Sequence, residues 1–269
     1  MDDPTMPHRT HTVGKAAVRL YVRDDGPEHG PPILLLSGLG MSEAAWDAVA
    51  DRLVDGGHRV LRHDTRGHGR SDAPNSGPRL ADLTADALAV LDALDVPRAH
   101  VAGHSLGGMV AVQLALERPE RVASVALLGA LVAGQRPPPA FREWASSVLG
   151  LLEENGLPAL LEGLPDTAAF RHRIADPAVA AALRRQVTTT LRAPVFVPEN
   201  FADVPAVAGA TPNPWKRVCS GELAVPLLTL DGADDPVVSG IAEPTATHVP
   251  GARALGKWAG RPAGPLRYP

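Results

Sequence analysis

The sequence predicts an α/β fold in which a mostly parallel sheet is covered by helices on both faces. Short, continuous apolar runs bounded by proline and glycine, such as residues 33–36, are typical of strands buried on both faces. Segments with apolar residues at helical spacing, such as residues 80–94, separate these runs. A glycine-rich turn at residues 103–107 joins one strand directly to a helix. Strand and helix therefore alternate, which requires parallel strands with helical connections.

The elements of this core are expected in a regular order along the chain. Residues 1–14 are polar and are expected to be loosely held. The expected strands are residues 16–22, 33–36, 58–63, 100–103, 123–128 and 225–230, and the expected core helices are residues 42–53, 80–94 and 106–117. Ser42 is a suitable N-cap for the first of these helices.

The pattern changes between residues 132 and 223. Helical stretches at residues 138–155, 158–164 and 177–191 follow one another without buried strands between them. We interpret residues 132–223 as a helical cap inserted before the last strands, with residues 1–131 and 224–269 as the core. A helical appendage on the surface is the alternative.

Composition excludes several classes of partner and site. Apolar residues make up 45% of the 269 residues and charged residues 21%, an ordinary globular balance. The net charge of −4 argues against nucleic acid or an anionic membrane as partner. The single cysteine, Cys219, cannot form an internal disulfide, which is typical of a reducing compartment. With neither a signal-peptide pattern nor a membrane-length apolar run, a cytoplasmic protein is expected.

The turn at residues 103–107 carries the clearest chemical signal. Gly103-His104-Ser105-Leu106-Gly107 matches the Gly-x-Ser-x-Gly nucleophile elbow, with a strand before it and a helix after it. In such a turn the glycines let strand and helix approach, while the serine hydroxyl is exposed at the positive end of the helix. Ser105 is therefore the predicted nucleophile. A glycine-rich turn with an incidental serine is the alternative.

Three segments together resemble the α/β-hydrolase superfamily: DTRGHGRSD at residues 64–72, GHSLGGMVA at residues 103–111 and ERPERVASVALL at residues 117–128. The resemblance covers residues 16–130 and 224–256. Within the superfamily, the sequence is most similar to 3-oxoadipate enol-lactonases and small carboxylesterases.

The resemblance implies roles for residues near the elbow. The backbone amides of Leu39, in the turn after an early strand, and of Leu106 would form the oxyanion hole. Asp64, Arg66 and Ser71 would shape a loop after a strand. His63 and His68 are likewise expected to be loop residues rather than catalysts.

The resemblance also implies an acid, which follows Gly232 by three positions and is therefore Asp235. Its role would be to orient and stabilise a histidine. Asp234 is the neighbouring alternative. The order of serine before acid along the chain is the one that this fold uses.

A serine, an acid and a histidine form the catalytic triad of the family, and in this chain the histidine departs from the family pattern. Where the family carries Gly-His, this chain has Gly260-Arg261-Pro262, and arginine stays protonated and cannot act as a base. His248 is the only histidine after Asp235, but it precedes the last strand and should lie at the edge of the sheet opposite the active site. His104 adjoins Ser105, but neighbouring side chains on an elbow point apart.

The sequence thus favours a cofactor-free hydrolase of a small carboxylic ester or lactone, acting through an acyl-enzyme on Ser105. No dinucleotide-binding glycine pattern and no metal-ligand cluster is seen in the sequence, so no cofactor and no metal are expected. Two alternatives follow from the missing histidine. One is a binding protein that has lost turnover, and the other is a lyase or cyclase that does not use the full triad.

Overall fold

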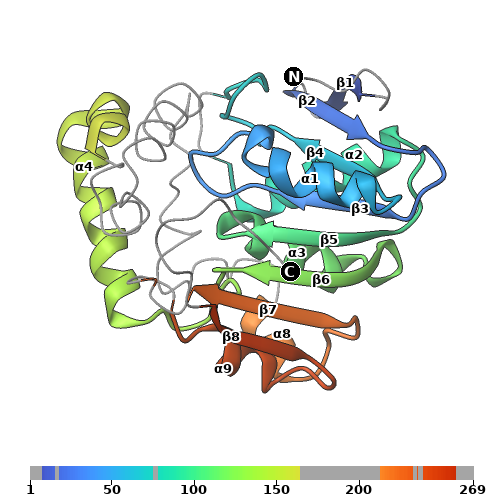
Figure 1. Cartoon of the computed structure of the whole chain (residues 1–269). Coiled ribbons are helices and arrows are strands. Elements are labelled where there is room, and N and C mark those ends of the chain that lie inside the picture. The colour runs from blue at the N-terminus through green and yellow to red at the C-terminus, as the bar shows by residue number, and fades with distance from the viewer. Residues whose placement is uncertain are drawn as a thin grey trace.

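The computed structural model describes residues 8–15, 18–74, 78–163, 213–232, 235 and 239–258. Within these residues, eight strands form one sheet in the order β1-β2-β4-β3-β5-β6-β7-β8 (Figure 1). The strands are β1 (His8–Lys15), β2 (Val18–Asp25), β3 (Pro32–Leu36), β4 (Arg59–His63), β5 (Ala99–His104), β6 (Val122–Leu128), β7 (Leu227–Gly232) and β8 (Arg253–Trp258).

Most of the described helices connect consecutive strands, and one long helix lies beside the sheet. They are α1 (Asp47–Asp55), α2 (Leu80–Ala93), α3 (Leu106–Glu117), α4 (Pro139–Gly163), α8 (Pro214–Cys219) and α9 (Ala242–Ala246), with short 3-10 turns η1 (Glu43–Trp46) and η2 (Pro119–Arg121). Among the described residues, no helix has both the length and the apolar character that crossing a bilayer requires.

The neighbouring strands β4, β3, β5, β6, β7 and β8 are parallel to one another. At one side of the sheet, β2 pairs antiparallel with both β1 and β4. The register places Leu36 of β3 opposite Gly103 of β5, and His104 of β5 opposite Leu128 of β6. The carboxyl ends of these strands therefore meet at one edge of the sheet. In open α/β sheets this edge is where ligands bind.

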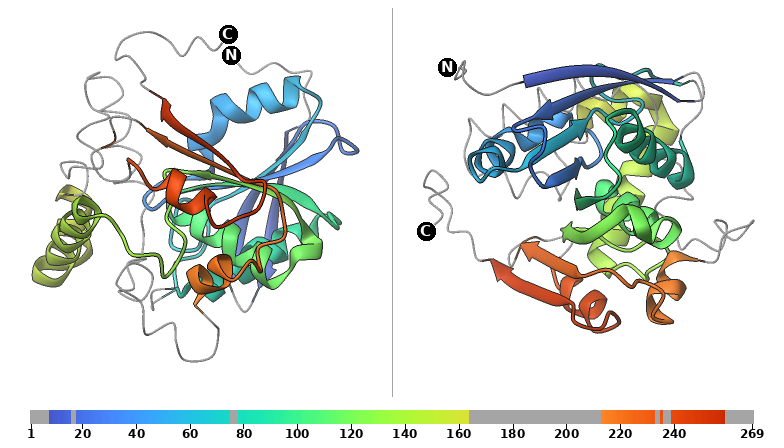
Figure 2. Two further views of the ribbon diagram at one scale, coloured as in Figure 1. Left: turned by 90° about the horizontal axis from the view of Figure 1, so that it is seen from below. Right: turned by 90° about the vertical axis from the view of Figure 1, so that its right-hand side faces the viewer.

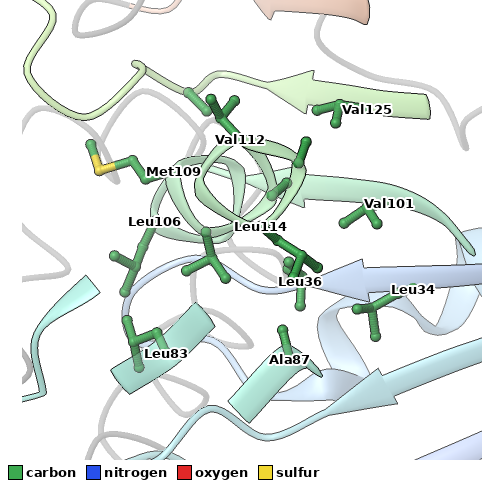
Figure 3. Close-up of a cluster of buried hydrophobic side chains, with 14 of the residues drawn as sticks. Leu34, Leu36, Leu83, Ala87, Val101, Leu106, Met109, Val112, Leu114 and Val125 are labelled. Atoms are coloured by element: carbon green, nitrogen blue, oxygen red, sulfur yellow. The ribbon is translucent and has the colours of Figure 1, made fainter. Parts of the chain in front are cut away.

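Helices cover both faces of the sheet. On one face, α1 and η1 pack Trp46, Ala50 and Val54 against the sheet in a small buried cluster. The other face carries α2, α3, α8 and α9 on a larger continuous core. The right-hand view of Figure 2 shows α1 and α2 on opposite sides of the strands. Helix α3 is buried almost all round because it lies between the sheet and α2 (Figure 3).

The predicted fold class is confirmed, since the sheet is mostly parallel and has helices on both faces. The prediction for the N-terminus is wrong in part. Residues 8–15 form β1, whose polar side chains alternate on an antiparallel edge strand next to β2. The strand expected at residues 16–22 is described from Val18 and extends to Asp25.

The predicted helices at residues 138–155 and 158–164 are joined in α4, which is kinked at Gly156. This glycine has φ 73° and ψ −164°, a conformation outside the helical region. The helix expected at residues 177–191 lies outside the described residues. The sequence patterns did not predict the short helices α8 and α9.

Candidate active site

The turn between β5 and α3 has the geometry of a nucleophile elbow. Ser105 lies at φ 50° and ψ −115°, in the region of positive φ that residues with a Cβ rarely adopt. Such a conformation costs about 1–3 kcal/mol and persists only where the surrounding structure holds it. Here the Ser105 amide donates a hydrogen bond of 3.1 Å to the Leu128 carbonyl, and the Ser105 carbonyl accepts one of 2.9 Å from the Gly108 amide. The serine is thus held between β6 and the first turn of α3.

The glycines around Ser105 are required by close packing of the backbone. A Cβ atom on Gly103 would overlap the backbone of Gly107. A Cβ atom on Gly107 would overlap the carbonyl of Leu36 in β3, and one on Gly108 would overlap the side chain of Ala130. The expectation that these positions must be small is therefore confirmed.

The loop after β3 packs directly on the elbow. Because Leu36 and Gly103 are paired in neighbouring parallel strands, residues 37–40 leave the sheet beside the turn that follows β5. A Cβ atom on Gly38 would lie only 2.6 Å from Nδ1 of His104, so a larger side chain there would displace the imidazole. The two turns that were expected to supply the oxyanion donors are therefore in contact.

The two proposed donor residues occupy these adjacent turns. Leu39 is buried in the loop after β3. Leu106 is the first residue of α3, and an amide at that position has no acceptor within its own helix. The partial positive charge at the start of α3 also favours an anion at this place. The arrangement is compatible with the stabilisation of a developing oxyanion.

His68 fixes the loop that carries Leu39. Its Nε2 atom accepts a hydrogen bond of 3.0 Å from the amide of Gly40, so Nδ1 carries the proton and donates to the carbonyl of Arg66 at 3.3 Å. The side chain is fully buried. Burial lowers the pKa of His68 to about 4, so the ring is neutral at neutral pH. His68 is therefore a structural residue of the loop, as expected.

We expect His68 to make the protein sensitive to acid. In the unfolded chain its pKa returns to the ordinary value of 6.5, so the unfolded state takes up a proton before the folded state does. The stabilising contribution is complete above pH 6.5. It falls by up to about 1.4 kcal/mol per pH unit as the pH drops towards 4.

The measurement is the free energy of unfolding in urea at several pH values for the wild type and for His68→Gln. Glutamine can accept from Gly40 and donate to Arg66 but does not titrate. The variant should lose stability less steeply than the wild type between pH 6.5 and 4. If the free energy of unfolding falls equally steeply with pH in both proteins, His68 is not the source of the acid sensitivity.

The DTRGHGRSD segment shapes the loop after β4, as expected from the resemblance. The carboxylate of Asp64 accepts a hydrogen bond of 2.9 Å from the amide of Arg70, and the hydroxyl of Ser71 donates to the Asp64 carbonyl at 2.5 Å. Arg66 forms two hydrogen bonds of 2.6 and 2.5 Å with the buried carboxylate of Asp86. The hydrogen bonds of these polar side chains therefore stabilise the loop.

Asp235 lies in the turn that follows β7. Its amide donates to the carbonyl of Gly232 at 3.2 Å, and its carbonyl accepts from the amide of Ser239 at 3.3 Å. Because β5, β6 and β7 are adjacent and parallel, Asp235 and Ser105 follow strand ends at the same edge of the sheet. The alternative acid, Asp234, lies outside the described residues.

A second carboxylate at this edge was not predicted. Asp231, the penultimate residue of β7, is buried and accepts a hydrogen bond of 2.6 Å from the amide of Ala242. The amides of Gly240 and Ile241 also hydrogen-bond to it, so Asp231 fixes the start of α9. Burial raises the pKa of Asp231, although these amides oppose the shift. The sequence signal that could have indicated this role is a charged residue at the end of an otherwise apolar strand.

The structure places His248 away from the elbow. It is exposed, with Nδ1 2.8 Å from the carbonyl oxygen of Pro244 and its ring packed edge-on against Trp215 at 4.9 Å between centroids. It precedes β8 and so lies towards the amino-terminal end of the strands, opposite to the end that Ser105 follows. The expectation that His248 is badly placed agrees with this position. Residues 260–262 lie outside the described residues.

Comparisons with known proteins agree on one family. A family model described as the alpha/beta hydrolase fold matches residues 31–196. A protein of Variovorax paradoxus (strain S110) that carries the name carbamate hydrolase RutD is 46% identical over 112 residues. That match covers 41% of this chain and 42% of the relative, so it spans about two fifths of the relative's length.

Several solved structures match over most of the chain. A hydrolase from Pseudomonas aeruginosa PA01 aligns with a TM-score of 0.73 and 28% identity, covering 96% of this chain and 92% of that one. The enol-lactonase from Burkholderia xenovorans LB400 aligns with a TM-score of 0.69 and 28% identity, covering 93% of this chain and 91% of that one.

Proposed function

Because the chain belongs to the alpha/beta hydrolase fold family, we propose that it is a cofactor-free serine hydrolase of a small carboxylic ester or lactone. The observation that carries the proposal is the strained backbone of Ser105, at φ 50° between β5 and α3. Backbone strain of this kind occurs at functional sites, and here it belongs to the one serine in the expected elbow.

The proposed reaction proceeds in two steps through a covalent intermediate. The Ser105 hydroxyl loses its proton to a base and attacks the substrate carbonyl, while the amides of Leu39 and Leu106 bind the oxyanion. The alcohol leaves with a proton, and water then hydrolyses the acyl-enzyme. Asp235, at the same edge of the sheet, is proposed to orient the base.

The names of the similar proteins support this substrate class. The Burkholderia structure is an enol-lactonase, and the Variovorax protein is named as a carbamate hydrolase. Lactones and carbamates both present a carbonyl that carries a heteroatom leaving group, as carboxylic esters do. A small molecule is therefore the proposed partner.

We also propose that residues 132–223 form a cap on a core made of residues 1–131 and 224–269. Figure 1 shows α4 beside the sheet, on the side to which the arrow of β7 points. Its first turns are anchored because Phe141, Trp144 and Val148 are buried. A helix in this position can restrict access to the strand ends, which is how caps select substrates.

One observation favours a different function. Gly260-Arg261-Pro262 stands where the family carries Gly-His, and a serine that lacks its base is a weak nucleophile. The second candidate is therefore a binding protein, or a lyase or cyclase, that retains the site without hydrolytic turnover.

The test is turnover of p-nitrophenyl acetate, p-nitrophenyl octanoate and a small aliphatic lactone by the purified chain. We expect hydrolysis of the short ester and the lactone at a rate well above background, unchanged by EDTA because no metal takes part. Saturable binding of these compounds without hydrolysis would overturn the proposal in favour of the binding protein.

A further inference from the structure

A small hollow borders the first residues of α3 and the start of the loop after β3. It is bounded by the ends of β3 and β4, by α2 and by the first turns of α3, and it has room for about one water molecule. Its lining includes Leu36, Ser37, His63, Thr65, Leu106 and Gly107. Two of these residues directly follow the nucleophile in sequence, and Ser37 opens the loop that carries the proposed donor Leu39.

His63 is one of the residues that line this hollow, and its ring carries a buried polar atom. It is the last residue of β4, and its side chain is 4% exposed. Among the described residues, no group hydrogen-bonds to its Nδ1 atom. Burial lowers the pKa of His63, although Asp86 and Asp64 oppose the shift. A neutral imidazole has one donor and one acceptor nitrogen, so Nδ1 can take part in a hydrogen bond in either tautomer.

Two further lining residues, Ser37 and Gly107, carry polar groups with hydrogen-bonding capacity. The Ser37 hydroxyl donates to the carbonyl of Ser42 at 3.1 Å, which leaves its oxygen able to accept. Gly107 is the second residue of α3, and its amide has no acceptor within the helix. Buried water molecules occupy polar hollows of this kind, where they make two to four hydrogen bonds.

We propose that the hollow binds one ordered water molecule, which joins Nδ1 of His63 to the hydroxyl of Ser37. The water connects the end of β4 to the start of the loop at residues 37–40. That loop packs on the elbow through Gly38. His63 is thereby a positioning residue, which acts on the oxyanion donors through the water and touches no substrate.

The catalytic consequence rests on the proposed hydrolase function. Amide donors aimed at an oxyanion stabilise the transition state more than the bound ester, so a loosened loop should lower kcat and leave KM nearly unchanged. Loss of packing alone would not distinguish polar from apolar replacements of the same shape.

His63→Asn and His63→Leu form a matched pair for this test. Their side chains have similar size and the same branching at Cγ, and both remove the same part of the ring, but only asparagine keeps a polar atom near the position of Nδ1. The readouts are high-resolution crystal structures of the wild type and both variants, and kcat and KM for p-nitrophenyl acetate.

We expect a water molecule within hydrogen-bonding distance of Nδ1 and the Ser37 hydroxyl in the wild type. It should persist in His63→Asn and be lost in His63→Leu, whose kcat should fall about tenfold below that of His63→Asn at similar KM. A wild-type hollow without this water, or equal kcat in the two variants, would overturn the proposal. The wild-type crystal structure decides the water site even if the chain hydrolyses no ester, so failure of the proposed function is recognised separately.

Discussion

Replacement of Ser105 by alanine is expected to lower kcat for p-nitrophenyl acetate by about 1,000-fold or more. Alanine removes the atom that attacks the carbonyl, and loss of a catalytic serine in other hydrolases costs as much as loss of the whole triad. The folded state should be retained, because the Ser105 contacts to Leu128 and Gly108 use backbone atoms alone. Alanine also has a Cβ atom, so the strain at φ 50° is unchanged.

Ser124 provides a matched control for this experiment. It lies in β6, and its hydroxyl is 2.7 Å from Nδ1 of His100, so it is a serine that contacts a histidine away from the elbow. That pair lies near the amino-terminal ends of β5 and β6, opposite to the elbow. Ser124→Ala should keep wild-type turnover. If both variants retain activity, or if only Ser124→Ala loses it, Ser105 is not the nucleophile.

Replacement of Arg62 by methionine is expected to destabilise the fold by about 3–5 kcal/mol. Arg62 is 1% exposed inside β4 and hydrogen-bonds to Asp25 at 2.5 Å and to Asp47 at 2.6 Å. Its guanidinium also lies 3.4 Å from the carboxylate of Glu43. Methionine would leave two buried carboxylates, those of Asp25 and Glu43, without this cation. The measurement is the free energy of unfolding from urea titrations of both proteins. A lower midpoint with an unchanged m-value shows a loss of stability.

Arg19→Met is the control for this prediction. Arg19 pairs with Asp72 at 3.1 Å, but its side chain is 74% exposed, so water and salt screen the interaction. This variant should unfold at nearly the wild-type urea concentration. Equal destabilisation by both substitutions would mean that burial does not determine the strength of these ion pairs.

The parallel half of the fold was predictable because its signals are local. Residues 33–36 form a strand buried among neighbours, and a continuous apolar run is sufficient to indicate such a strand. The glycines of the elbow were also predictable, since their small size is needed within one turn. By contrast, β1 has no apolar run. It is formed because its backbone pairs with β2, which depends on the arrangement of the chain in space.

The candidate site was predictable only in part, for the same reason. Ser105 follows from five consecutive residues. The hydrogen bond between His68 and Gly40 joins residues 28 positions apart, and no periodicity reports it. Asp231 caps α9 by accepting a hydrogen bond from the amide of Ala242. This helix is too short to show a sequence pattern. The water-sized hollow beside His63 arises from four separate elements meeting, which a linear pattern does not encode.

The central claim is that Ser105 is an activated nucleophile, and covalent labelling with a fluorophosphonate probe tests it most directly. The chain is incubated with the probe and digested, and the modified peptide is identified by mass spectrometry, with Ser105→Ala and Ser124→Ala alongside. We predict a single adduct on Ser105 that is absent in Ser105→Ala and unchanged in Ser124→Ala. No adduct on the wild type, or an adduct on any other residue that persists in Ser105→Ala, would contradict the claim.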